Sequence, residues 1–537
     1  MSGEHHGRAA TPRMAHPELV AARLRNAAAA AAPPAASRSR PALSRASGRR
    51  AGARRAAALA DRVADAALAP RWPTAGERPR VAWFSPLSAR SAVGDFSRHV
   101  TEELARIADV ELWTADRGPV RGSSVPVTRF DPAVPPCAAD LRDHDVVVYN
   151  LGNYPPFHAP IHDASQRVPG VVILHDRVLH HMFAAKWQAE AEGEAAFAER
   201  YRSRMALHHG AGGERAAGAS PPLWERPDEV VRFPLDTEAL RFALGVVTHS
   251  ADHATALARR WLGPLRALPL PCYRDVLAAA CARRPAPAAD GRVRLVSLGH
   301  VIANKNVERV VAMLAADRAL AARVRYTVIG HLDPGLDLAG EVERARARAP
   351  ELAVDLLGWQ PDAVRDRLLA GADVFVNLRH PVMESGSASL ARELAFGRPV
   401  LCFAAGSFAE LPAGAVAQVP AGDFEAAAAR LRTLVADAGL RMRIGERARA
   451  VAAARSEHAY AADLLDFFAD VARSAPWLTA IDRAGVELGR LGLAADTAAL
   501  AAAARTLALR SPDGLGARAA AGARQPDGRT GSLAAAI

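Results

Sequence analysis

Residues 372–404, ADVFVNLRHPVMESGSASLARELAFGRPVLCFA, contain the pattern that decides the fold. The apolar run at 372–378 predicts a buried strand, and apolar side chains at helical spacing over 388–397 predict an amphipathic helix. A second apolar run follows at 399–404. A strand, a helix and a strand in this order are typical of two parallel strands joined by a helix.

The same rhythm occurs in two parts of the chain. Buried strands are predicted in the first part at 80–87, 110–114, 145–150, 170–176 and 244–250, and in the second part at 293–299, 324–330, 354–359, 372–378 and 399–404. Helical or loop segments separate them. The sequence therefore predicts an α/β protein with two Rossmann-like parallel-sheet domains that face each other across a cleft. Ligands of such folds bind at the carboxyl ends of the strands.

Composition divides the rest of the chain. We expect a disordered basic tail over 1–77 with room for one short helix, a first α/β domain over 78–282, a linker over 283–291, a second α/β domain over 292–455, helices over 456–510 and a disordered tail over 511–537.

The net charge of +11 lies mostly in the first tail. Residues 1–60 contain 11 arginines against Glu4 and Glu18, which is 11 − 2 = +9 and leaves 11 − 9 = +2 for the remainder. A nearly neutral body argues against specific nucleic-acid binding. The tail is predicted to be a solvated extension, with weak contact to anionic surfaces as the alternative.

Cysteine usage and hydropathy indicate the compartment. The four cysteines have no CxxC spacing, the N-terminus has no apolar leader, and no run approaches the roughly 18 apolar residues of a membrane span. The sequence predicts a cytoplasmic protein, with peripheral attachment at the inner membrane face as a further option.

Common α/β signatures are missing from the sequence. GxGxxG follows no predicted strand, neither lysine follows a glycine as in a Walker A loop, and GxSxG and HExxH do not occur. These observations argue against dinucleotide-dependent, P-loop, α/β-hydrolase and zincin chemistry.

Lys305 and a small-residue loop point to a phosphate. Among 68 basic residues only Lys186 and Lys305 are lysines, and a lysine is a compact point charge suited to a crowded phosphate. The small residues Ser385, Gly386, Ser387 and Ala388 precede or begin a predicted helix, whose N-terminus attracts anions. Glu384 suits sugar hydroxyls. Together these groups predict a nucleotide-diphosphate sugar, whereas the alternative is that the serines only cap a helix and Glu384 is a surface acid.

The second half resembles the donor domain of GT-B glycosyltransferases, in particular the retaining enzymes of family 4. The resemblance is carried by SLGHVIANKN (297–306), LLGW (356–359), the stretch 372–401 and AELP (409–412). The first half is similar more loosely, through SPLSARSAVGDFSRHV (85–100), YNLGNYPPFHAPI (149–161), GVVILHDRVLHHMF (170–183) and VVTHS (246–250).

The resemblance implies roles for individual residues. Lys305 corresponds to the lysine on the donor diphosphate, Glu384 to the first of two glutamates and the one that meets the sugar, His175 to the catalytic histidine near the transferred sugar, and Gly94 to the glycine loop facing the phosphates. Two positions depart from the pattern. His300 replaces an arginine, and Arg392, followed by Glu393, stands where the second glutamate usually contacts the ribose.

The implied activity is hexosyl transfer from a nucleotide-diphosphate sugar to a glycan, lipid or other acceptor with retention of configuration. The alternatives are a nucleotide-sugar epimerase or an inactive binding or scaffold protein. The resemblance implies no cofactor and no metal, and DHD (143–145) precedes a strand, whereas a metal-binding DxD follows one. A metal site made of His175, Asp176, His180 and His181 remains an alternative.

Overall fold

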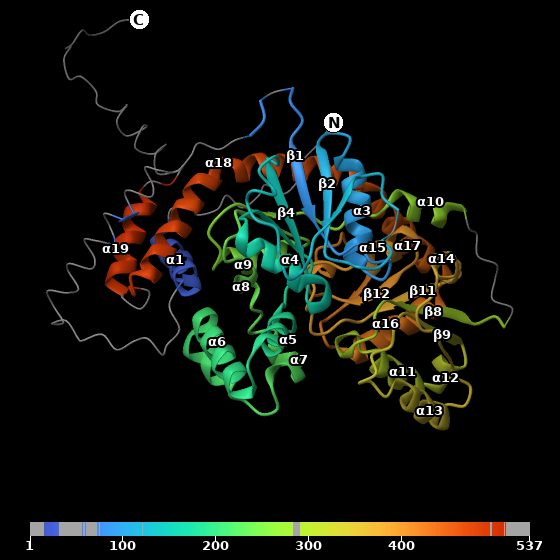
Figure 1. Cartoon of the computed structure of the whole chain (residues 1–537). Helices are drawn as coiled ribbons and strands as arrows, with labels where there is room; N and C mark the ends of the chain where they lie inside the picture. Colours follow the sequence, from blue (N-terminus) through green and yellow to red (C-terminus); the bar gives the residue numbers. More distant parts are fainter. Residues whose placement is uncertain are drawn as a thin grey trace, which may run out of the picture. The chain divides into compact units, whose positions relative to one another are not determined.

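The computed structural model describes residues 16–31, 56, 59–60, 72–74, 76–120, 122–282, 290–493, 497–509 and 511. Most of the predicted linker and of both predicted tails lies outside these residues. The chain forms two compact units. The first contains Trp72–Arg259 and Leu265–Ala469, and the second combines Arg260–Pro264 with helices from both ends of the chain. Figure 1 shows the labelled elements.

The first unit begins with a parallel sheet of seven strands in the order β3-β2-β1-β4-β5-β6-β7. Its strands are β1 (Arg80–Phe84), β2 (Asp109–Thr114), β3 (Val127–Arg129), β4 (Val146–Leu151), β5 (Val171–Leu174), β6 (Gly245–Thr248) and β7 (Leu265–Ala267). Around them lie α3 (Ala92–Leu104), α4 (Pro155–Arg167), α5 (His180–Glu190), α6 (Glu194–Ala217), α7 (Pro227–Val230), α8 (Asp236–Ala239), α9 (Ala251–Ala258) and α10 (Arg274–Ala282).

The second sheet is parallel throughout, with six strands in the order β10-β9-β8-β11-β12-β13. Its strands are β8 (Val293–Leu298), β9 (Val324–Ile329), β10 (Ala353–Leu356), β11 (Val374–Asn377), β12 (Val400–Phe403) and β13 (Ala417–Val419). Its helices are α11 (Val307–Ala315), α12 (Arg318–Ala321), α13 (Leu338–Arg348), α14 (Asp362–Ala370), α15 (Ala388–Ala395), α16 (Phe424–Ala436) and α17 (Ala438–Ala454). The predicted α/β class is confirmed.

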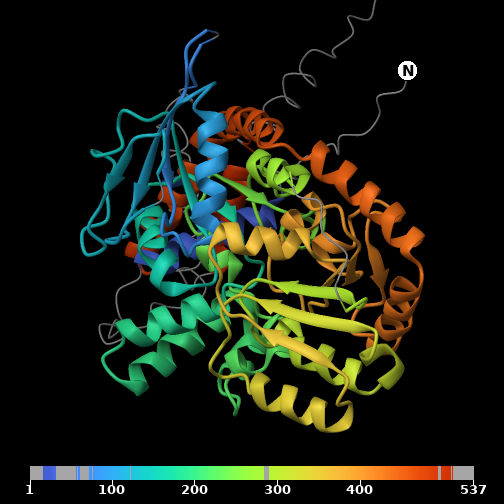
Figure 2. The ribbon, with the colours of Figure 1, turned by 90° about the vertical axis from the view of Figure 1, so that its right-hand side faces the viewer.

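Apolar side chains of the second sheet alternate between two cores. Val374 and Val376 of β11 join the core beneath α11, α13 and α16, whereas Phe375 joins the core beneath α10, α15 and α17. This alternation follows from the two-residue period of a strand. It explains why the three successive residues 374–376 are all apolar: both faces of the sheet are covered, as Figure 2 shows.

The strand order places the ligand site. In each sheet, successive strands are added first on one side of the opening strand and then on its other side. This reversal of strand order falls between β1 and β4 in the first sheet and between β8 and β11 in the second. Loops that leave such neighbouring strands on opposite sides open a crevice at their carboxyl ends. Residues after these four strands are therefore expected to line a common cavity.

The second unit is helical. It contains α1 (Pro17–Ala31), the later part of α18 (Glu457–Arg490) and α19 (Thr497–Ala508). Arg23 of α1 forms a buried, two-bonded ion pair with Asp482 of α18, with Nε–Oδ1 and Nη2–Oδ2 distances of 2.8 and 2.6 Å. Gly485 and Gly489 have no room for a side chain because the α1 backbone lies against them.

The disordered-tail prediction therefore needs a correction at residues 17–31. These residues form α1, and Val20, Leu24 and Ala27 are buried. Alanine-rich sequence carries little apolar area per residue, which makes this segment resemble a tail. Glycines on the partner helix let the backbones approach closely enough for alanines to form a core. Among the described residues, no helix is both long and apolar enough to cross a membrane.

Candidate functional site

A cavity of about 920 Å³ opens at the carboxyl ends of both sheets. Every strand on either side of the two reversal points contributes to its wall. The first half supplies Ser91, Ala92, Val93 and Asp95 after β1, Asn153, Tyr154, Phe157 and His158 after β4, and Asp176 after β5. The second half supplies Gly299 and His300 after β8, Gly330 and His331 after β9, Trp359 after β10, and Ala388, Ser389 and Arg392 after β11.

Gly94 lies beside the cavity, in the first turn of α3. A Cβ atom there would lie 2.7 Å from the Pro86 carbonyl oxygen, so glycine is needed for α3 to pack against the loop after β1. Its N–H donates to the Ser91 side chain, which caps the helix. The flanking residues, rather than Gly94, line the wall.

Two glycines that the sequence analysis did not select are part of the wall. Gly299 and Gly330 end β8 and β9 with φ angles of +107° and +139°. A side chain on Gly330 would collide with the Gly299 carbonyl, and one on Gly299 would collide with Lys305 Nζ. Glycine at the end of both apolar runs is the signal that was available in the sequence.

Lys305 lies directly behind Gly299. It ends a short 3-10 turn, Ala303–Lys305, and its Nζ donates to the Leu298 carbonyl at 3.1 Å. Burial, and then the charge of Arg379, lower the pKa of Lys305 well below its usual value. The lysine is thus held at the back of the cavity wall, in a place where an incoming anion would stabilise its charged form.

Glu384 is not a surface acid. It forms an ion pair with Arg379, and the two side chains are only 10% and 11% exposed. Arg379 also donates to Asn377 Oδ1 at 2.9 Å and to Ser389 Oγ at 2.8 Å. Arg379 was missed in the sequence because arginine is the ordinary cation of this chain, and only its position two residues after β11 distinguishes it.

Residues 383–385 are hydrogen-bonded to the first half, and we call these contacts the interdomain bridge. The Ser385 N–H donates to the His175 carbonyl at 2.9 Å, and the Arg177 N–H donates to the Met383 carbonyl at 2.7 Å. Ser385 Oγ accepts from the His249 N–H at 2.7 Å and bonds His253 Nδ1 at 2.9 Å. The bridge places Glu384 opposite Asp176.

The remaining small residues have separate positions. Gly386 packs against the His249 side chain, where a Cβ atom would lie 2.6 Å from the His249 Cβ. The Ser387 hydroxyl caps α15 by accepting from the Leu390 N–H, as the capping alternative predicts. Ala388 and Ser389 line the cavity.

His175 lies below the wall, partly buried, and is not part of its lining. Its Nε2 contacts Asn150 Oδ1 at 3.0 Å and its Nδ1 contacts His249 Nε2 at 3.2 Å. Burial lowers its pKa well below the usual value, so the ring is neutral. Its neighbour Asp176 reaches the cavity instead, and burial, opposed by the Asn153 N–H bond, raises the Asp176 pKa to about 7.

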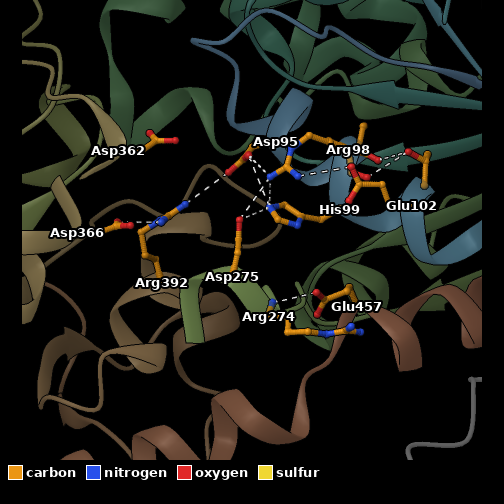
Figure 3. Close-up of polar contacts among 12 residues, drawn as sticks. Asp95, Arg98, His99, Glu102, Arg274, Asp275, Asp362, Asp366, Arg392 and Glu457 are labelled. Carbon is orange, nitrogen blue, oxygen red and sulfur yellow. Dashed lines mark hydrogen bonds and ion pairs between the residues drawn. The ribbon is translucent and has the colours of Figure 1, made fainter. Parts of the chain in front are cut away.

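Arg392 faces the cavity and links both halves, as Figure 3 shows. Its Nη1 lies 3.2 Å from Asp366 and its Nη2 lies 3.5 Å from Asp95 of α3. Asp95 is also 3.8 Å from His99, which in turn lies 3.5 Å from Asp275. A guanidinium held by two carboxylates therefore occupies the position at which the resemblance implies a glutamate.

Glu393 lies on the buried side of α15. Its carboxylate accepts from Asn377 Nδ2 at 3.0 Å, and burial raises its pKa to about 7. It does not line the cavity and cannot substitute there for the missing glutamate. His300 is exposed in the wall, 5.2 Å from the His331 ring between centroids.

The four residues of the alternative metal site point to different partners. His180 bonds the Phe233 carbonyl and the Tyr201 hydroxyl, both at 2.7 Å, and His181 bonds Asn153. Within the described ranges, no group of three or more His, Cys, Asp or Glu side chains could hold a metal ion. Asp145 of DHD accepts the Arg80 N–H at the entrance to β1.

Two solved structures with a similar fold are named as synthases. Sucrose-phosphate synthase from Thermosynechococcus elongatus matches with a TM-score of 0.51 at 16% identity, over 72% of this chain and 97% of its own. The alpha,alpha-trehalose 6-phosphate synthase from Burkholderia multivorans matches with a TM-score of 0.50 at 14% identity, over 74% and 100%. These likenesses show the fold. No curated protein sequence matches this chain.

A family model matches the second half of the chain. Residues 282–451, which contain the second sheet with Lys305, Arg379 and Glu384, match the model described as Glycosyl transferases group 1. The first sheet and the cavity complete the two-domain arrangement. The chain has the GT-B fold, and its residues 282–451 form a domain that matches the group 1 glycosyl transferase model.

Proposed function

We propose that the protein transfers a hexosyl group from a nucleotide-diphosphate sugar to a hydroxyl acceptor with retention of configuration. The observation that carries this proposal is that these charged groups lie directly behind one cavity: Lys305 lies behind the lining residue Gly299, and Arg379 of the Arg379–Glu384 pair contacts the lining residue Ser389. Cation and carboxylate lie on the group 1 side of the cavity, which suits a diphosphate attached to a sugar.

Each side chain has a role in this proposal. Lys305 and the N-terminal amides of α15 stabilise the departing diphosphate, because preorganised donors act strongly in a desolvated site. Glu384, oriented by Arg379, accepts from sugar hydroxyls. The acceptor hydroxyl attacks the anomeric carbon on the face from which the diphosphate departs, the glycosidic C–O bond to phosphate breaks, and the departing phosphate oxygen takes the acceptor's proton. His175, held by Asn150 and His249, positions Asp176 and the bridge.

The direct test is turnover of UDP-, GDP- and ADP-sugars. Release of the nucleoside diphosphate with a product of unchanged anomeric configuration by NMR supports the proposal. Recovery of the epimeric nucleotide sugar identifies an epimerase instead. Tight binding of nucleotide sugars without turnover, across an acceptor panel, identifies a binding protein.

Activity should survive EDTA. The positive groups assigned to the diphosphate are Lys305 and the helix amides, so no metal is required for charge stabilisation in this proposal. The measurement is nucleoside diphosphate release with and without the chelator. Complete loss that manganese or magnesium restores would contradict the assignment.

Glu384→Gln should lower sugar transfer about tenfold, the size of a lost charge-assisted hydrogen bond. The affinity for the bare nucleoside diphosphate should change little, since the carboxylate is assigned to hydroxyls. Steady-state kinetics and calorimetry separate the two effects. Glu446→Gln, at an exposed position of α17, is the matched control. An equal loss of diphosphate binding in Glu384→Gln would assign Glu384 to the phosphate end.

A further inference from the structure

Two aromatic side chains of the first half line the cavity and do not belong to the hydrophobic core of that half. Tyr154 directly follows the loop after β4 and is 57% exposed. Phe157, one turn later in α4, lies 5.1 Å from it between ring centroids, at 71°. An aromatic ring that remains in solvent on the wall of a cavity, beside a second ring, offers an apolar surface to a ligand.

Polar groups lie immediately beside this aromatic surface. His158 Nδ1 is bonded to the Asn150 carbonyl at 3.1 Å, and its Nε2 has no hydrogen-bond partner in the described part of the chain. Asp176 Oδ2 accepts the Asn153 N–H at 2.7 Å. The His158 and Asp176 side chains meet at Gly152, where a Cβ atom would lie 2.8 Å from Nε2 and 3.0 Å from Oδ2. A carboxylate and an imidazole therefore face the cavity next to Tyr154.

This combination discriminates between acceptor classes. A pyranose ring has an apolar C–H face that packs on an aromatic ring and hydroxyls that donate to a carboxylate. An acyl chain would cover the remaining hydrogen-bonding atoms of Asp176 and His158 without offering them a hydrogen bond, which is costly. A phosphorylated acceptor packed on Tyr154 would place its anion beside the Asp176 carboxylate, whereas Arg90, the lining arginine of the first half, lies on the separate loop after β1.

We propose that the acceptor is an uncharged sugar ring that packs against Tyr154 and Phe157 and donates a hydroxyl to Asp176. The proposal rests on the proposed transferase function and narrows it from glycan, lipid or other acceptor to a glycan. Tyr154 is a specificity-determining residue in this assignment. Asp176 orients the hydroxyl that attacks the donor.

The experiment compares transfer with hydrolysis. Four proteins are compared: the parent, Tyr154→Ala, Tyr154→Phe and Met442→Ala. One assay measures slow nucleotide-sugar hydrolysis in water. The other measures transfer to uncharged glycosides, to sugar phosphates and to a long-chain alcohol. Met442 is exposed on α17 and does not line the cavity, so it controls for loss of an exposed side chain. Folding of each variant is checked by circular dichroism.

Tyr154→Ala should raise the acceptor KM for glycosides about five- to tenfold, the size expected for one aromatic contact. Hydrolysis in water and the donor KM should not change, and Tyr154→Phe should resemble the parent because it keeps the ring. Better transfer to the alcohol or to sugar phosphates than to any uncharged glycoside would overturn the proposal, as would an equal effect of Tyr154→Ala on hydrolysis.

The two proposals fail in different ways. If the parent turns over no nucleotide sugar, the proposed function is wrong, and the wall is then tested by saturation-transfer NMR with methyl glycosides. Glycoside signals that Tyr154→Ala abolishes and Tyr154→Phe retains would still support the sugar-binding wall. Glycoside signals that are absent, or that are unaffected by Tyr154→Ala, would overturn it.

Discussion

Lys305→Ala should weaken nucleoside diphosphate binding by about ten- to hundredfold, as expected for loss of a charge-assisted contact. Lys305 Nζ lies against Gly299, which forms the cavity wall, and its pKa is lowered by burial and by Arg379. A diphosphate there would add negative charge beside this ammonium and stabilise its charged form. Lys305→Arg should also bind weakly, because a planar fork does not fit the space behind Gly299.

Calorimetry with a nucleoside and with its diphosphate makes this prediction specific. The diphosphate should lose affinity in Lys305→Ala, and the nucleoside should not. Lys186→Ala is the matched control, since Lys186 is the other lysine of the chain and pairs with Asp163 and Glu190. Diphosphate affinity equal to that of the parent would make Lys305 a structural residue that only holds the Leu298 carbonyl.

Arg23→Met should lower the free energy of unfolding of the helical unit by about 3–5 kcal/mol, because it leaves a buried carboxylate without its cation. The side chains of Arg23 and Asp482 are only 5% and 6% exposed. Burial raises the pKa of Asp482, and Arg23 opposes that shift. Without Arg23, the buried Asp482 carboxylate must either bind a proton or be hydrated by water that enters the unit.

Hydrogen exchange of peptides from α1 and α19 measures the loss of stability in the helical unit. Both should exchange faster in Arg23→Met, while β8 and β11 peptides stay protected. Arg23→Met with Asp482→Leu should recover much of the loss, because an apolar pair of similar volume avoids the desolvation cost. Unchanged exchange of α1 in the single variant would show that the ion pair contributes no stability.

Much of the sheet architecture was predictable because long buried strands have distinctive apolar runs. The edge strands β3, β7 and β13 were not predicted, since each has only three residues and takes its conformation from a neighbouring strand. The segment of α1 was misread because alanine gives a weak hydrophobic signal. Its core depends on glycines that are more than 450 residues away in the sequence.

The candidate site was only partly predictable for the same reason. Strand ends predicted that Lys305, Glu384 and His175 lie close to the cleft. In the structure Lys305 lies behind Gly299, Glu384 is paired with Arg379, and His175 lies below the wall. The partners of Ser385 could not be read from sequence: His249 is separated from it by 136 residues, and nothing local marks that pairing. Arg379 could not be singled out in the sequence, because 68 − 2 = 66 of the basic residues are arginines.

The interdomain bridge has a mechanical consequence. A rotation of one half that keeps the bonds of Ser385 to His175 and His249 would use residues 383–385 as its fulcrum. Glu384 would stay beside Asp176 throughout such a rotation, while the Arg392–Asp95 ion pair, 3.5 Å long, would have to separate. The cavity would then open about residues 383–385, next to the position that the proposed function assigns to the sugar.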